Sequence, residues 1–393
     1  MKRSSVLTGT GPGRLLLALA AAVITAMGLA AGATAGTAPA GTPAKAPAGT
    51  WKLLPAAPVT KLGPGAFTSS AWTGDELVIH DVRYSSGAFR RVTFGYRPAT
   101  NTWVSLARGP KPLSGLEAND VSAWTGSELL VNGVTDGAYN PAADTWRPIP
   151  LDGPNEGAVV AWTGHQAIVW GGVCCASASN NGEAYDPATN TWSKLPAAPL
   201  RPRRGAEGAW TGTELVVAGG FAWTDYPQSV GLKDGAAYNP ATGTWRAIAP
   251  MPRRERGAVA VWDGTEILFL GGYRPGASGP PNQGLAYNPA TNTWRKLPRM
   301  AYPRTGFAAV WTGRQLLVWG GVTGTYTDPV LPPHGEAYNP AANQWTALPA
   351  SPLRGRNVAA AAWTGHSMIV WGGWAPNRST TYLDGAIYTP TTP

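Results

Sequence analysis

The sequence has few cysteines, few histidines and little charge, and each shortage excludes a class of site. Its 393 residues include two cysteines, Cys174 and Cys175, which are neighbours, so a disulfide framework and a Cys-x-x-Cys zinc or redox motif are both excluded. A bond between adjacent cysteines strains the backbone, so the pair is either bridged, free or joined between chains. The four histidines are scattered, and no Ser/His/Asp constellation, metal-ligand spacing or phosphate loop is present. We therefore expect no metal and no cofactor.

Helical periodicity is also missing. No amphipathic helical stretch appears after residue 50, and only 13% of the residues are charged. The chain is instead rich in Gly (50), Pro (37) and Trp (19), a composition typical of many short strands joined by turns. The sequence thus predicts an all-β protein.

The first 35 residues have the three parts of a secretory signal peptide. Lys2, Arg3 and Arg14 form the basic region, residues 15–30 the apolar region, and residues 33–35 (Ala-Thr-Ala) the cleavage site. The apolar run is shorter than the roughly 20 residues that a membrane span needs, so a retained anchor is the weaker alternative. We expect cleavage, a secreted, extracellular protein, and no membrane span in the mature chain.

A Pro/Ala-rich linker is predicted over residues 36–50, because they contain almost nothing that a fold can bury. The folded part is predicted to begin at Trp51. Without the three basic residues of the signal, 28 Lys and Arg face 22 Asp and Glu, so the net charge falls from +9 to +6. Nucleic-acid binding requires a basic stripe with interleaved aromatics on one element, and none is found outside one set of loops, which is considered below. We expect no nucleic-acid partner.

One segment, residues 286–294 (AYNPATNTW), recurs in near copies along the chain. In each copy a Tyr is followed seven positions later by a Trp, at Tyr96/Trp103, Tyr139/Trp146, Tyr185/Trp192, Tyr238/Trp245, Tyr287/Trp294 and Tyr338/Trp345. A second signature, Trp followed by Thr-Gly or Asp-Gly, occurs seven times, at Trp72, Trp124, Trp162, Trp210, Trp262, Trp311 and Trp363. A repeat of roughly 40 to 50 residues is typical of β-propellers.

Each repeat predicts four strands, named a to d from the axis outward. In the fifth repeat, residues 256–262 form the inner strand a, Asp263-Gly264 a hairpin turn, and strand b ends at Gly271-Gly272. The glycine pair is expected to admit a neighbouring backbone or ring. Strand c ends at Tyr287 before a proline, and strand d begins at Trp294. Because the Trp and Tyr rings recur at a fixed phase, we expect them to pack between blades rather than bind a ligand.

The two ends of the chain complement each other. The seventh unit has a strand c, which ends at Tyr388, but no strand d follows it, whereas residues 51–55 (WKLLP) look like a strand d with no strands before it. Pairing the two would leave neither terminal edge open. We predict a closed, monomeric, seven-bladed β-propeller over residues 51–393, with four-stranded antiparallel blades and the last blade completed by the strand around Trp51.

A strand that ends in Gly-Gly, then a Tyr, then a Trp seven residues on, resembles the kelch repeat. The resemblance covers residues 51–393 and is weakest in the first unit, which lacks the glycine pair. The propeller of galactose oxidase is similar, with seven kelch blades, and its activity needs a copper site of two Tyr and two His with a Cys cross-linked to one Tyr. His80, His165, His334 and His366 cannot be matched to that pattern, so we expect no copper oxidase activity.

The d–a and b–c loops share one face of such a propeller, and this face varies most in sequence, which is where function usually lies. We predict a ligand site on it, near the axis. The candidate residues are Arg203, Arg204, Arg256, Arg304, Arg356, Glu117, Glu156, Trp223, Tyr273 and Trp374. Arginines next to aromatics suit a carboxylated or sulfated sugar through bidentate pairing and stacking. For any single arginine, the alternative is a structural role in which it caps carbonyls and joins blades.

These observations predict a secreted binding or interaction module whose partner is an extracellular glycan or protein. An anionic glycan or protein is one possibility that the arginines suggest. Two other classes stay open. The exported kelch sugar-acid mutarotases are the nearest enzymes in resemblance, and Glu117 or Glu156 would then serve as the general base. A purely structural surface protein is the third.

Overall fold

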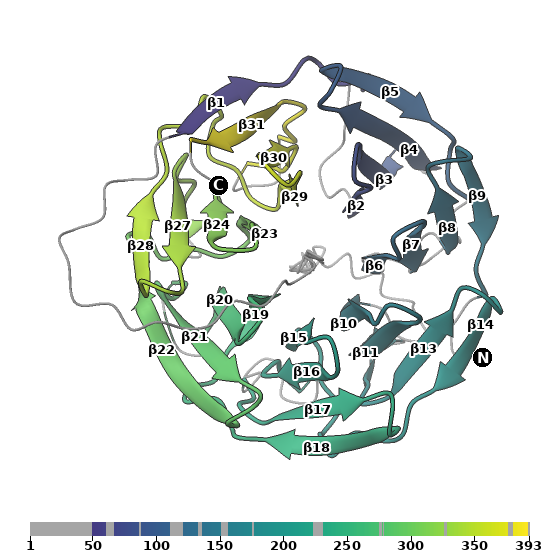
Figure 1. Cartoon of the computed structure of the whole chain (residues 1–393), viewed down its shortest axis with the longest axis vertical. Coiled ribbons are helices and arrows are strands. Elements are labelled where there is room, and N and C mark those ends of the chain that lie inside the picture. The colour runs from purple at the N-terminus through teal and green to yellow at the C-terminus, as the bar shows by residue number, and fades with distance from the viewer. Residues whose placement is uncertain are drawn as a thin grey trace, which may run out of the picture.

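The computed structural model describes residues 49–59, 67–85, 88–110, 121–132, 136–150, 156–174, 177–222, 231–274, 277, 279–325, 328–375 and 380–391. The predicted signal peptide and all but the last two residues of the predicted linker lie outside this part of the chain. The described residues form a ring of seven four-stranded antiparallel sheets (Figure 1), which confirms the predicted seven-bladed propeller.

The strands of each blade follow one another from the axis outward. Blades 1 to 3 are β2 (Phe67–Trp72), β3 (Leu77–Ser85), β4 (Ala88–Arg97) and β5 (Thr102–Leu106); β6 (Val121–Trp124), β7 (Leu129–Asn132), β8 (Gly137–Asn140) and β9 (Thr145–Pro148); and β10 (Glu156–Trp162), β11 (Ala167–Cys174), β13 (Gly182–Asp186) and β14 (Thr191–Lys194). Blades 4 and 5 are β15 (Glu207–Trp210), β16 (Leu215–Ala218), β17 (Gly235–Asn239) and β18 (Thr244–Ile248); and β19 (Arg256–Trp262), β20 (Ile267–Tyr273), β21 (Gln283–Asn288) and β22 (Thr293–Arg299). Blade 6 is β23 (Ala308–Trp311), β24 (Leu316–Trp319), β27 (Gly335–Asn339) and β28 (Gln344–Ala347), and blade 7 is β29 (Ala360–Trp363), β30 (Met368–Trp371), β31 (Gly385–Pro390) and β1 (Gly49–Leu53). Two short additions are β12 (Ser177–Ala178), which pairs with β11, and the hairpin of β25 (Thr323–Gly324) and β26 (Pro329–Val330).

The N-terminal strand closes the ring, as predicted. β1 pairs antiparallel with β31 in a register that places Trp51 opposite Tyr388. The strand begins at Gly49, two residues before the predicted start of the folded part. Leu54 continues the pairing, since its amide donates to the carbonyl of Gly385 over 2.9 Å. The last sheet is therefore built from both ends of the folded chain.

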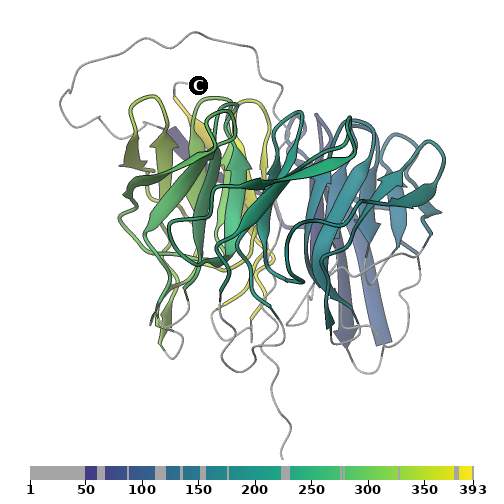
Figure 2. The same ribbon diagram turned by 90° about the horizontal axis from the view of Figure 1, so that it is seen from below.

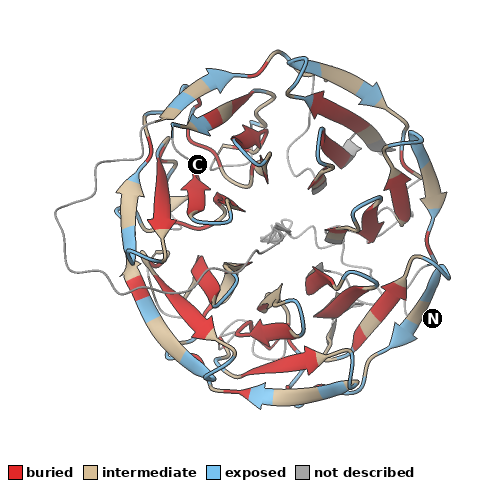
Figure 3. Cartoon of the chain, in the orientation of Figure 1, coloured by how far each residue is buried: buried red, intermediate tan, exposed pale blue. Residues whose placement is uncertain are grey.

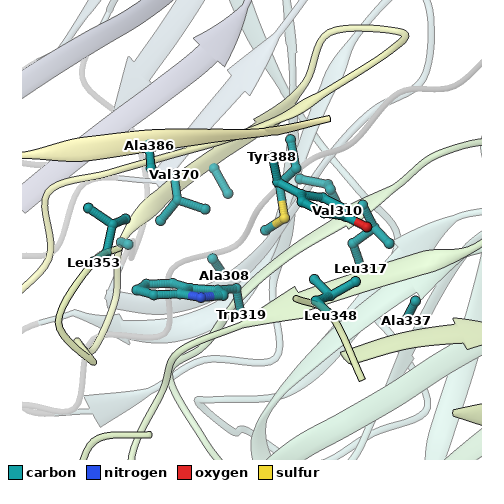
Figure 4. Packing of buried hydrophobic residues seen from close by; sticks show 13 residues of the cluster. Ala308, Val310, Leu317, Trp319, Ala337, Leu348, Leu353, Val370, Ala386 and Tyr388 are labelled. Atoms are coloured by element: carbon teal, nitrogen blue, oxygen red, sulfur yellow. The ribbon is translucent and has the colours of Figure 1, made fainter. Parts of the chain in front are cut away.

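Burial follows strand position within each blade (Figure 3). The second strands lie inside, and every residue of β16, β24 and β30 is buried, whereas the outermost strands consist mainly of exposed and half-buried residues. Between blades 6 and 7, Trp319, Leu353 and Tyr388 pack face to face with small residues from both inner strands (Figure 4). Because these side chains are almost fully removed from water, each contributes roughly 1.5–3 kcal/mol of hydrophobic free energy.

The Trp of each outermost strand joins its blade to the previous one through a hydrogen bond. The indole Nε1 of Trp103 donates to the carbonyl of Pro55 over 2.9 Å, and Trp51 donates to Pro349 over 3.1 Å. The same bond recurs in the other five blades, from Trp146 to Ala107, Trp192 to Pro150, Trp245 to Pro196, Trp294 to Ala249 and Trp345 to Pro298. These rings are structural, as expected from their fixed phase.

The glycine pairs lie where one blade meets the backbone of the next. The glycine pair of blade 4 is Gly219-Gly220. The amide of Gly220 donates to the carbonyl of Glu255 in the following blade over 3.0 Å. Gly219 has a positive φ, and a Cβ there would lie 2.8 Å from that same carbonyl oxygen. Only glycine fits such an approach without a shift of the backbone. The predicted role of the pair in admitting a neighbouring backbone is therefore confirmed.

Seen from the side, the blades stand next to one another and their connections lie on two opposite faces (Figure 2). The a–b and c–d turns of one face are tied together by repeated polar contacts. In one example, Arg147 pairs with Glu128 at 2.6 Å and also donates to the hydroxyl of Tyr185 in the next blade over 2.7 Å. Arg295, Glu266 and Tyr338 repeat this arrangement between blades 5 and 6. This face is largely committed to holding the ring together.

No helix in the described part of the chain has the length and hydropathy to cross a membrane.

Candidate functional site

The opposite face, which we call the loop face, carries the d–a and b–c connections. Here the chain enters each inner strand through two successive positions, seven and six residues before the strand a Trp. The first position is occupied by Arg203, Arg304 and Arg356 in blades 4, 6 and 7, and the second by Arg204, Arg256, Thr305 and Asn357 in blades 4 to 7. The arginines at these two positions differ in how far their side chains are buried.

Residues at the first position point into the protein. Arg203, Arg304 and Arg356 are at most 1% exposed. Each donates to the carbonyl of the first glycine of its own pair, at distances of 3.0–3.1 Å, and each forms an ion pair with an acid at the start of strand c. Those acids are Asp234, Glu336 and Asp384. The structural role that was the alternative for single arginines is the one that these three have, because a ligand on the surface has no access to them.

The two arginines at the second position are partly exposed to solvent. Arg204 and Arg256 are both half-buried, and their guanidinium carbons lie 4.8 and 4.6 Å from the centre of the Phe221 ring. Arg256 also lies 5.9 Å from the ring of Tyr273, its partner across β19 and β20. Cation–π contacts of this kind contribute roughly 0.5–1 kcal/mol each at exposed sites and hold the guanidinium planes in place. We call these four residues the arginine–aromatic cluster.

The next residue in each blade holds this part of the loop face in a fixed position by bonding to its neighbour around the axis. The amide of Gly205 donates to the carbonyl of Gly157 over 2.8 Å, Gly257 donates to Gly205 over 3.1 Å, and Val358 donates to Gly306 over 2.7 Å. All five residues have a positive φ, between 49° and 70°. The arginines that precede Gly205 and Gly257 therefore start from a backbone that the inter-blade bonds have fixed.

The remaining predicted site residues are distributed differently. Trp374 is 4% exposed and its backbone exchanges two hydrogen bonds with Asn357, so its ring does not offer a surface to a ligand. Glu156 begins β10, where its backbone pairs with Val173, so the Glu156 backbone lies at the loop-face end of the inner strand of blade 3. Glu117 and Trp223 lie outside the described residues. The structure thus brings Arg204, Arg256 and Tyr273 together around Phe221, and turns Arg203, Arg304 and Arg356 inward.

A buried acid follows Arg204 three residues later in the chain. Glu207, at the start of β15, is 3% exposed, and its Oε1 accepts from the amide of Ala258 in blade 5 over 2.8 Å. Burial raises the pKa of Glu207 well above its usual value, and the nearby Glu255 raises that pKa further. The raised pKa means that Glu207 takes up a proton more readily than an exposed glutamate. Sequence reasoning missed it, although it is the one acid at that phase of an inner strand in the repeats.

The histidines do not make a copper site. His80 is buried, with Nδ1 3.0 Å from the hydroxyl of Thr93 and its ring packed on Trp146, while His165 and His366 lie exposed in a–b turns and His334 is exposed on the loop face. Among the described residues, no group of three or more His, Cys, Asp or Glu side chains is arranged to hold a metal ion. The described histidines therefore do not fit the copper centre of galactose oxidase.

Comparison with known proteins identifies the architecture. The family model of the Attractin/LZTR1 β-propeller matches residues 138–376, more than half of the chain. Among solved structures, a fungal alcohol oxidase of the AA5 family, described as catalytically diverse and in complex with copper, superimposes with a TM-score of 0.67. It is 18% identical, and the match covers 87% of this chain and 76% of that one, so the likeness concerns the fold alone. Both findings confirm a kelch-type propeller that resembles galactose oxidase. No curated protein matches the chain.

Proposed function

Because the chain belongs to the Attractin/LZTR1 β-propeller family, we propose that it is a secreted binding module that holds an anionic extracellular glycan on its loop face. The observation that carries this proposal is the arginine–aromatic cluster, in which Arg204 and Arg256 lie over one ring and stay partly exposed. Two guanidinium groups held against one ring each offer donors that match the geometry of a carboxylate or sulfate group.

The surroundings of the cluster favour an anion over a neutral ligand. In the described part of blades 4 and 5, the loop-facing ends of the strands and loops carry seven arginines that are half-buried or exposed: Arg201, Arg204, Arg253, Arg254, Arg256, Arg274 and Arg299. The acids described there are the buried Glu207 and Glu255, and Asp234, which pairs with the buried Arg203. A field of one sign over a face raises the local concentration of ligands of the opposite sign.

A glycan suits this site because rings accompany the charges. Tyr273 is half-buried next to Arg256, and the ring of Phe221 contacts both guanidinium groups. Sugar acids present an anionic group on an otherwise hydroxylated ring, which an arginine and an aromatic side chain can contact together. The mutarotase-like alternative depends on Glu117 and Glu156, and no described side chain favours it.

The test is binding of polygalacturonate, dextran sulfate and neutral dextran by the mature protein, measured by calorimetry. The double variant Arg204→Gln/Arg256→Gln is expected to weaken binding of an anionic polymer by at least about 10-fold, which corresponds to about 1.4 kcal/mol. Arg354→Gln is the matched control, because Arg354 is exposed on the loop side of blade 7 and the substitution removes the same kind of charge. The proposal is contradicted if the parent binds neutral dextran as tightly as it binds the anionic polymers. It is also contradicted if the double variant and the parent have equal affinity for every anionic polymer.

Export is tested separately. The basic, apolar and small-residue parts of residues 1–35 support it. Mass spectrometry of protein collected from the culture medium is expected to find an N-terminus close to residue 36. An intact N-terminus on protein that stays with the cells contradicts secretion.

A further inference from the structure

Blade 5 departs from a charge arrangement that three other blades share. In blades 4, 6 and 7, the position seven residues before the strand a Trp holds one buried arginine, and the start of strand c supplies one acid for it. In blade 5 the same position is Glu255, and the start of strand c is the neutral Gln283. Blade 5 therefore has the acid where the other blades have the cation.

Cations from elsewhere in blade 5 surround this acid. Glu255 is 1% exposed, and Arg253 donates to its Oε1 over 2.5 Å, while Nε of Arg274 lies 3.6 Å from the same oxygen. Arg253 also donates to the carbonyl of Gln283. These contacts replace those that the buried arginine makes in the other blades, and one cation is enough to balance the carboxylate.

A third guanidinium completes the group. Arg299, at the end of β22, is exposed and donates to Oδ1 of Asn282 over 2.9 Å. Arg299 lies opposite Gln283 in the register of β21 and β22, and Arg253 donates to the carbonyl of Gln283, so these two arginines lie close to each other. Burial lowers the pKa of Arg274, and the positive charges of Arg253 and Arg299 lower that pKa further. Arg253 and Arg274 thus flank one carboxylate and Arg299 lies on the neighbouring strand opposite Gln283, which leaves an excess of positive charge that the other blades do not have.

We propose that Arg253, Arg274 and Arg299 form a second anion subsite, and that the ligand is a polyanion whose successive sulfate or carboxylate groups occupy this subsite and the arginine–aromatic cluster together. The inference rests on the proposed function. The two sites lie close along the chain, since Tyr273 of the cluster and Arg274 of the subsite are consecutive residues, and only two residues separate Arg253 from Arg256. A partly exposed cation next to other cations gains most from an anion brought in by a ligand.

The experiment compares a single-anion probe, glucose 6-sulfate, with a polymer, dextran sulfate. Arg274→Gln/Arg299→Gln is expected to weaken binding of dextran sulfate by at least about 10-fold and to reduce its salt dependence, because fewer counterions are displaced. Binding of glucose 6-sulfate at the arginine–aromatic cluster is expected to change little. Arg253 is left intact because it holds Glu255 and Gln283.

Three outcomes separate this inference from the proposed function. If Arg204→Gln/Arg256→Gln weakens both probes while Arg274→Gln/Arg299→Gln weakens only the polymer, both hold. If Arg274→Gln/Arg299→Gln binds dextran sulfate as the Arg354→Gln control does, the second subsite is overturned and the proposed function survives. If the parent binds neither probe, both are overturned. Thermal unfolding of each variant shows whether a loss of binding comes from misfolding. The single variant Arg299→Gln is a further control, because its substitution lies at an exposed position.

Discussion

Arg304 donates a hydrogen bond to Glu336 over 2.7 Å, and both side chains are buried. The second oxygen of Glu336 accepts from the amide of Ala301 over 2.8 Å, while Arg304 also donates to the carbonyls of Gly320 and His334. One ion pair therefore joins the d–a loop, the glycine pair and strand c of blade 6. Asp234 and Asp384 repeat this arrangement in blades 4 and 7, but with acids that stay about half exposed.

Removing one member of the buried pair is expected to be costly. Arg304→Leu leaves Glu336 charged and unpaired inside the protein, so the free energy of unfolding should fall by about 3–5 kcal/mol. The double variant Arg304→Leu/Glu336→Leu should lose less than Arg304→Leu alone, because no charge is then left without a partner. Urea denaturation of the three proteins is the measurement. A double variant that is less stable than Arg304→Leu would show that the pair itself, not the orphaned charge, provides the stability.

Ring closure can be tested at Trp51. Its indole donates to Pro349 and packs 5.9 Å from Trp319 and 5.2 Å from Tyr388. Trp51→Phe should cost about 1 kcal/mol, since it removes mainly the hydrogen bond. Trp51→Ala should cost about 3–5 kcal/mol, since it also leaves a cavity between blades 6 and 7.

The neighbouring variant Lys52→Ala is the control, because Lys52 is exposed on the same strand. Thermal and urea unfolding report the three stabilities. If Trp51→Ala unfolds like Lys52→Ala, β1 does not contribute to closure.

Val358 has a backbone conformation that disfavours its side chain. Its φ is +49°, and the residues at the same position in blades 3, 4, 5 and 6 are all glycine. A β-branched residue in this left-handed region carries a strain of order 1–2 kcal/mol. Val358→Gly should therefore raise the free energy of unfolding by about 1 kcal/mol, after the greater flexibility of glycine in the unfolded chain is counted. Val358→Ala keeps a Cβ and should gain less, so an equal gain in the two variants speaks against strain as the cause.

His80 predicts a loss of stability in acid. Burial of the ring, and to a smaller degree the charge of Arg91, lowers the pKa of His80 to about 3, well below the usual 6.5 of the unfolded chain. Its contribution to stability is complete above pH 6.5 and is lost as the pH falls from 6.5 toward 3, by about 1.4 kcal/mol for each pH unit. His80→Gln should flatten the pH dependence of the unfolding free energy over this interval.

The matched variant is His334→Gln, whose histidine is exposed on the loop face. It should leave the slope between pH 6.5 and 4.5 as it is in the parent. Equal slopes in parent, His334→Gln and His80→Gln would mean that His80 is not the titrating group. Urea denaturation at a series of pH values provides the comparison.

Much of the fold was predictable because the same residue types recur at the same positions of each repeat. The Trp at the end of strand a, the Gly pair and the Tyr/Trp spacing mark the strands of a blade, and the unmatched strand around Trp51 revealed the closure. Each of these residues is constrained by contacts with the next blade, so the same type recurs wherever the contact recurs. Local pattern and tertiary packing agree at these positions.

The site was less predictable, since neighbouring arginines of the same loop have opposite orientations. Arg203 is buried and Arg204 lies at the surface, one residue apart. A signal for the difference was present: Arg203, Arg304 and Arg356 stand at one phase, and an acid follows each of them near the start of strand c. Residues outside the repeat pattern, such as Phe221 under the two guanidinium groups, are placed by loop geometry that the repeat does not encode.

The pairing of β1 with β31 also sets an order of events during synthesis. Residues 49–53 leave the ribosome first, yet the strand that they pair with, residues 385–390, is made last. Until then blade 7 lacks β31, the strand that joins β1 to β30, and the ring cannot close, so more than three hundred residues must be completed before the protein gains its full stability. A chain cut short anywhere before residue 385 would keep an unpaired edge on its first strand, which makes truncated products targets for aggregation or proteolysis.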